Sequence, residues 1–272
     1  MNVKQFCIHL IFIGYLGGSI TLQAQAGVVF GINNDHFVKV NLETAALEPI
    51  FKLNLPSGAD FRNLVYIPKD TSFYSIIYSD TKPSLVRINH NGQWRIIDAF
   101  KVGQQLPQFS KALTYNKKKD ELLVSLSLDA QVNDSKAEAL AIVNRQTAAC
   151  TVLATIRQLP PPDDFEKMAV YNNQLFCFDS NPDHDITYIY PFHLDQLKGE
   201  LFCGSKQNIP FFTMEDVLVI NDVVYFTDSR YHRLYYFNLI ARKWLKVGQF
   251  HGSLELGKIH LTGLALMPFS RA

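Results

Sequence analysis

Short apolar strands follow one another along this chain in repeating sets of four. In each set an apolar strand comes first, a second strand ends near Asp, a third carries Asn, and a fourth follows. The opening strands read FRNLVYIP, SKALTYNK, FEKMAVYN, MEDVLVIN and LTGLALMP. A long-period repeat with four strands per unit is typical of a β-propeller, in which each unit forms one blade.

The spacing of the opening strands predicts the number of blades. Their central apolar residues recur about every 50 residues, and these are Leu64, Leu113, Met168, Val217 and Leu264. The last opening strand has no strands after it, and the strands that follow Gly27 lack an opening strand. We therefore predict that the C-terminal strand completes the first blade, so that no sheet edge stays open at the junction.

The predicted fold is thus all-β: a single β-propeller of five four-stranded blades, with the ring closed by the C-terminal strand. A β-sandwich is the alternative, because it also contains many short strands. A sandwich, however, gives no reason for a constant period.

The first 26 residues are typical of a secretory signal peptide. Lys4 precedes an apolar stretch that is short for a membrane span, and Ala24-Gln25-Ala26 has the small residues that signal peptidase recognises. We therefore expect residues 1–26 to be removed and residues 27–272 to form the propeller. The mature protein is then expected to be secreted or periplasmic, with no transmembrane segment.

Charge and composition narrow the class of partner. The chain has 26 Lys and Arg against 25 Asp and Glu, and its dense basic run is Lys117-Lys118-Lys119. Nucleic acids bind clustered positive charge, so a nucleic-acid partner is not expected. A protein or a carbohydrate remains as the partner, and the run of three lysines is expected at a solvated hairpin turn.

Polar residues gather where the opening strands begin. In a propeller these strand starts meet at one mouth of the central channel, where binding groups often collect. The candidate ligand-binding residues are Asp60, Arg62, Lys111, Asp164, Glu166, Glu215, Asp216 and His260. A ring of mixed charge can also simply pair internally and solvate the channel.

Two carboxylates in this ring suggest catalysis or metal binding. Glu166 and Glu215 occupy the same repeat position in adjacent blades. Held close together, they could act as an acid and a base, or bind a divalent cation such as Ca²⁺ with nearby oxygens. A loop in the fourth blade, Asp183-His184-Asp185, could ligate a metal if other loops supplied further ligands.

The repeats resemble exported propellers of the NHL and gluconolactonase/regucalcin type. The segments FRNLVYIP with SFYSIIYSD, and FEKMAVYNNQLFCFDS, carry this resemblance. In the gluconolactonase-like enzymes a divalent metal lies in the channel on a Glu from an opening strand. By that resemblance Glu166 or Glu215 would hold the metal in this chain.

Two functions follow from the sequence. The first is a binding or interaction scaffold with its ligand site at the channel mouth, since no nucleophile motif or phosphate-binding loop occurs. The alternative is a metal-assisted hydrolase of lactones, esters or glycosides that uses the channel carboxylates.

Overall fold

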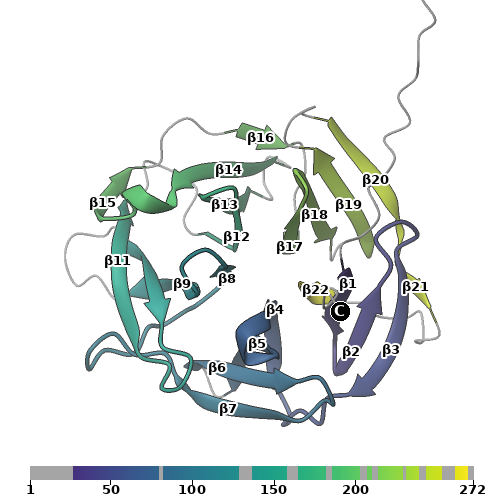
Figure 1. Cartoon of the computed structure of the whole chain (residues 1–272), viewed down its shortest axis with the longest axis horizontal. Coiled ribbons are helices and arrows are strands. Elements are labelled where there is room, and N and C mark those ends of the chain that lie inside the picture. Colours follow the sequence, from purple (N-terminus) through teal and green to yellow (C-terminus); the bar gives the residue numbers. More distant parts are fainter. Residues whose placement is uncertain are drawn as a thin grey trace, which may run out of the picture.

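The fold is a closed ring of blades around a central axis (Figure 1). The computed structural model describes residues 27–79, 82–128, 137–157, 165–181, 186–202, 207–209, 214–228, 231–238, 243–252 and 261–268. Within these ranges the strands form five sheets, and each sheet is one blade. The predicted five-bladed propeller is confirmed.

In the first three blades the strands follow one another from the channel outward. Blade 1 contains β22 (Leu261–Pro268), β1 (Gly27–Asn33), β2 (His36–Val40) and β3 (Ala46–Lys52), with β21 (His251–Gly252) parallel to β3. Blade 2 contains β4 (Asp60–Ile67), β5 (Ser72–Ser79), β6 (Lys82–Asn89) and β7 (Trp94–Ala99). Blade 3 contains β8 (Leu113–Asn116), β9 (Glu121–Leu128), β10 (Ala137–Val143) and β11 (Cys150–Arg157), with β15 (Gly199–Phe202) parallel to β11.

The last two blades have the same order and four strands each. Blade 4 contains β12 (Lys167–Tyr171), β13 (Gln174–Asn181), β14 (Ile186–His193) and β16 (Gln207–Ile209). Blade 5 contains β17 (Met214–Ile220), β18 (Val223–Asp228), β19 (Arg233–Asn238) and β20 (Lys243–Gln249). Two short 3-10 helices, η1 (Pro68–Asp70) and η2 (Leu194–Gln196), follow β4 and β14.

The C-terminal strand closes the ring, as predicted. β22 pairs antiparallel with β1 from Gly27 opposite Pro268 to Asn33 opposite Leu261, so blade 1 joins the two ends of the propeller. Figure 1 shows β22 as the inner strand of blade 1, beside β4 and β17. The backbone of β1 is thereby paired on both sides.

The apolar core lies between the blades rather than inside one of them. Each pair of adjacent blades buries its own hydrophobic cluster. β5 illustrates how: Phe73 and Ile77 face blade 1, whereas Tyr74 and Ile76 face blade 3. Since alternate side chains of a strand point to opposite faces, a strand buried on both faces reads as one continuous apolar run.

The Asn of the third strands caps the turn that follows. The Asn41 Oδ1 accepts the backbone N–H groups of Glu43 and Thr44, at 2.9 and 3.0 Å. Asn144 accepts the N–H groups of Gln146 and Thr147 in the same way, at 2.9 and 3.2 Å. This repeated feature of the sequence is therefore structural.

Gly263 allows blades 1 and 2 to meet closely at the channel. A Cβ at this position would lie 2.7 Å from the Leu64 Cβ and 3.2 Å from the Asn63 carbonyl carbon. We expect Gly263→Ala to destabilise the fold by about 3 kcal/mol, since backbone must move to admit the methyl group. Thermal unfolding should show a fall in Tm on the order of 10 °C.

Gly248→Ala is the matched control for this substitution. A Cβ at Gly248 would meet its nearest atom at 3.5 Å, an ordinary contact. Its Tm should stay close to that of the parent chain. Equal Tm values for the two variants would show that Gly263 does not limit the approach of the blades.

Candidate functional site

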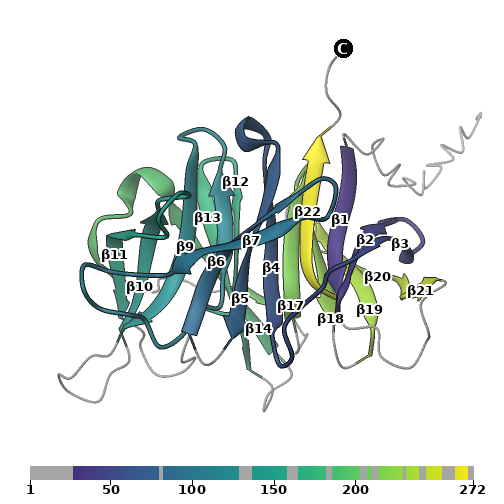
Figure 2. The same ribbon diagram turned by 90° about the horizontal axis from the view of Figure 1, so that it is seen from below.

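The channel has two chemically different ends. All inner strands run in the same direction, so their first residues lie at one face, which we call the loop face, and their last residues at the other, which we call the turn face. Figure 2 shows the propeller from the side, with the C-terminal end of β22 at the turn face. Those residues of the predicted polar ring that the structure describes lie at the loop face.

At the loop face, Arg62 is held by two neighbours. Its Nε lies 3.1 Å from the Asp60 Oδ2, and its guanidinium stacks 4.8 Å above the Tyr78 ring. The Tyr78 hydroxyl donates to the Ser110 carbonyl oxygen at 2.5 Å and accepts the Ser110 N–H at 2.9 Å. Burial raises the pKa of Tyr78, which keeps it a neutral donor.

Glu166 and Glu215 stand beside a buried lysine that the repeat pattern did not reveal. Lys167 is 7% exposed, and burial lowers its pKa although Asp216, Glu215 and Glu166 all attract its charge. The two glutamates are partly exposed and lie at the loop face beside this cation. The structure therefore brings together the predicted carboxylates from adjacent blades, with Lys167 near both.

Asp216 lies deeper and links blade 5 to blade 1. It is 3% exposed, and its Oδ2 accepts the Leu264 N–H at 2.5 Å. Its own N–H donates to the Thr227 hydroxyl at 3.1 Å. Burial raises the pKa of Asp216 to about 7, and the nearby charge of Lys167 opposes part of that rise.

Asn63 links blade 2 to blade 3 at the same level of the channel. Its Oδ1 accepts the Leu113 N–H at 3.1 Å, and its Nδ2 donates to the Lys111 carbonyl oxygen at 2.8 Å. Asn63 sits in a β-bulge of β4 with a φ of 61°, a conformation that Asn tolerates better than most residues. Its position just before the repeated apolar residue, which it shares with Lys167 and Asp216, is the signal that could have identified it.

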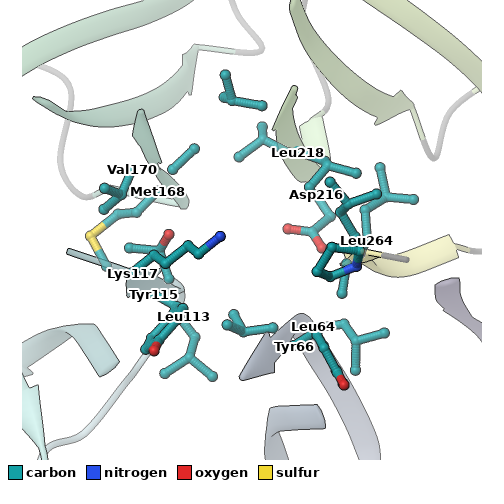
Figure 3. A pocket seen from close by; sticks show the side chains of 18 of the residues that line it. Leu64, Tyr66, Leu113, Tyr115, Lys117, Met168, Val170, Asp216, Leu218 and Leu264 are labelled. Atoms are coloured by element: carbon teal, nitrogen blue, oxygen red, sulfur yellow. The ribbon is translucent and has the colours of Figure 1, made fainter. Parts of the chain in front are cut away.

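A cavity of about 260 Å³ opens toward the turn face (Figure 3). All five inner strands contribute to its wall, which extends from Asp216 at the inner end to Pro68, Lys117 and Pro268 at the outer end. The repeated apolar residues that predicted the blade number form its middle: Leu64, Leu113, Met168, Val217 and Leu264. Of the predicted site residues that the structure describes, Asp216 alone belongs to this wall.

Ion pairs link the turns of blades 2 and 3 at the turn face. Arg145 contacts the Asp120 Oδ1 at 2.8 Å and the Asp70 Oδ2 at 3.3 Å, and Lys69 contacts Asp120 at 2.8 Å. The Tyr115 hydroxyl also donates to Asp120, at 2.9 Å. Hydrogen bonds from Arg145, Lys69 and Tyr115 hold the pKa of Asp120 well below its usual range. The run Lys117-Lys118-Lys119 lies in the β8–β9 turn, as predicted.

Several predicted residues lie outside the part that the structure describes. These are Asp164, Asp183, His184, Asp185 and His260, together with residues 1–26. Among the described residues, no group of three or more His, Cys, Asp or Glu side chains is placed to hold a metal ion. No helix within those ranges is long and apolar enough to cross a membrane.

Comparison with known proteins supports the fold. No protein-family model and no curated protein sequence matches the chain, so the resemblance to NHL-type and gluconolactonase-like propellers has no family-level support. One chain of a crystallised nidogen–laminin complex is 12% identical, with a TM-score of 0.54, over 88% of this chain and 97% of that one.

Two further solved structures are more distant. A protein of unknown function from Bacteroides caccae is 9% identical with a TM-score of 0.47, over 80% of this chain and 71% of that chain. The WD40 repeats of RRP9 are 11% identical with a TM-score of 0.43, over 72% of this chain and 53% of that chain. The likeness to the chain from the nidogen–laminin complex, together with the five sheets described above, identifies a β-propeller fold.

Proposed function

We propose that this propeller is a binding module that presents its loop face to a protein partner and carries out no reaction of its own. The observation that carries the proposal is a set of exposed apolar side chains around the polar mouth. Leu106, Phe109 and Tyr231 are 40%, 53% and 42% exposed. Aromatic side chains beside charged groups are typical of protein-binding surfaces.

The topology puts these residues on one face. The segment with Leu106 and Phe109 connects the end of β7 to the start of β8, and Tyr231 lies in the β18–β19 turn. Both segments lie at the end of the blades where the inner strands begin. A partner that spans the mouth would contact blades 2, 3 and 5 together.

The polar groups of the loop face fit this role. Asp60 and Tyr78 hold Arg62, so its charge is presented in a fixed direction at little further entropic cost. Lys167 lies near Glu166 and Glu215, and both carboxylates attract its charge. This buried cation holds charged groups of opposite sign together at the loop face.

Export is part of the proposal. Residues 1–26 carry the pattern of a signal peptide, and a secreted or periplasmic propeller would meet its partner outside the cytoplasm. The similar chain from the nidogen–laminin complex belongs to an assembly of two proteins. That likeness supports the interaction role only by analogy of fold.

The test compares capture by two double variants. Immobilised protein carrying Phe109→Ser and Tyr231→Ser should lose a partner that the parent chain retains from extracts of its native source. The control carries Ile50→Ser and Leu245→Ser, which remove side chains of similar exposure (45% and 49%) from the outer strands β3 and β20. The control should retain the partner.

Other outcomes would contradict the proposal. A partner equally retained by both variants would place the interface elsewhere. Binding to glycans instead of protein, in an array of carbohydrates, would replace the protein partner by a carbohydrate. Turnover of a lactone, ester or glycoside that Glu166→Gln abolishes would establish the hydrolase.

A further inference from the structure

We propose that the cavity at the turn face binds a small amphipathic monocarboxylate, with its apolar part inside the channel and its carboxylate at Lys117. This site lies at the opposite end of the channel from the proposed protein-binding face. This ligand site does not depend on the proposed protein-binding function, and an experiment can contradict either proposal without affecting the other.

The walls suit an apolar chain. Side chains from all five inner strands surround the cavity, most of them aliphatic, and Figure 3 shows Met168, Val170, Leu218 and Leu264 around the opening. Ligand pockets are commonly about 300–1,000 Å³ for drug-sized molecules. A cavity of about 260 Å³ therefore suits a smaller ligand.

A lysine stands at the mouth of the cavity. Lys117 is exposed, lines the cavity, and points across its opening in Figure 3. Two other lysines of this face have acidic partners, since Lys119 contacts Asp195 at 3.3 Å and Lys69 contacts Asp120 at 2.8 Å. Lys117 has no ion-pair partner within the described ranges. An anionic head group beside an apolar chain would supply one.

The other end of the cavity sets the orientation of the ligand. Asp216 lies there, next to Glu215 and Lys167. A carboxylate placed at that end would lie beside the buried carboxyl of Asp216, which lines the cavity there. An aliphatic chain that enters first, with its carboxylate left at Lys117, avoids placing two acidic groups side by side.

Calorimetric titration of the purified chain with straight-chain carboxylates tests the proposal. Octanoate, octan-1-ol and octylammonium serve as anionic, neutral and cationic probes of equal chain length. We expect octanoate to bind most tightly. From butanoate upward, affinity should rise by up to about fourfold per methylene group, and then level off when the cavity is full.

Two substitutions assign the contacts. Lys117→Gln should weaken octanoate binding by about fivefold and leave octan-1-ol unchanged, whereas Lys118→Gln, which alters a neighbour outside the cavity wall, should change neither. Val170→Trp should fill the opening and weaken all the probes more than tenfold, with an unchanged Tm to show that the fold survives. Absence of octanoate binding, tighter binding of octylammonium, or no effect of Lys117→Gln would each overturn the proposal.

Discussion

A chain that ends at residue 260 should lack a cooperative unfolding transition at 25 °C. The truncation removes β22, which is the inner strand of blade 1 and the pairing partner of β1. It also removes Leu261 and Leu264 from the cluster between blades 5 and 1, and Ala265 from the cluster between blades 1 and 2. Burial of a large aliphatic side chain is worth about 1.5–3 kcal/mol.

These losses approach the whole stability of a typical domain, about 5–15 kcal/mol. Circular dichroism during urea unfolding would show a broad, non-cooperative change instead of a sigmoidal transition. A chain that ends at residue 268 keeps all of β22 and should unfold as the full-length chain does. Addition of a peptide with the sequence of residues 261–272 should restore the transition of the shorter chain.

A sharp transition for the chain that ends at residue 260, without the peptide, would show that the ring is stable when open. Rescue by a scrambled peptide of the same composition would show that strand pairing is not the cause. Either result would contradict the view that this strand closes the propeller.

The architecture was predictable because the core lies between blades. Each inner strand must bury apolar side chains on both of its faces, so Leu64, Leu113 and Leu264 recur at one repeat position. Turn chemistry recurs for the same reason, since Asn41 and Asn144 accept equivalent backbone N–H groups. The blade made from both ends of the chain was predictable too, because the last opening strand has no strands after it and the strands after Gly27 have no opening strand before them.

The site was predictable only in part. The position that holds Arg62, Glu166 and Glu215 could be found from the repeat, and all three lie at the start of the inner strands. The next position, with Asn63 and Lys167, was missed because its role depends on the neighbouring blade. Hydrogen bonds and charges across a blade interface do not repeat along the sequence.

The cavity was missed for a different reason. Its wall consists of aliphatic residues such as Met168 and Val170, which in the sequence are indistinguishable from packed core. Five blades leave a space at the axis, and the size of that space depends on the angle between sheets rather than on any residue type. Lys117 was interpreted as an ordinary hairpin lysine, because the sequence does not show that it lies at the mouth of a cavity.

Asp216→Ala should destabilise the protein by about 3 kcal/mol, because it leaves a buried backbone N–H without an acceptor. The substitution leaves the Leu264 N–H without its acceptor and removes a carboxylate near the buried Lys167. Asp216→Asn keeps an oxygen that can accept the Leu264 N–H, and should cost about 1–2 kcal/mol. Urea unfolding at fixed pH measures both values, and equal costs for Ala and Asn would show that the hydrogen bond contributes nothing.

The pH dependence of stability should identify Asp216 separately. Its pKa of about 7 in the folded protein exceeds the value of about 3.9 expected in the unfolded chain, so folding favours the protonated carboxyl. The contribution of this group is then fully present below about pH 4 and is lost as the pH rises from about 4 to 7.

Between pH 5 and pH 8 the free energy of unfolding of the parent chain should therefore fall by on the order of 2 kcal/mol relative to that of Asp216→Asn, which cannot titrate at this position. The charge of Lys167 lowers the pKa of Asp216, and its removal in Lys167→Met should move this loss of stability to higher pH. Urea unfolding at each pH gives the difference in free energy of unfolding between the parent chain and Asp216→Asn. Glu166, Glu215 and Arg62 act on Lys167 in both proteins, so this difference reports the titration of Asp216. A difference that does not change between pH 5 and pH 8 would mean that Asp216 is already ionised in the folded protein throughout this range.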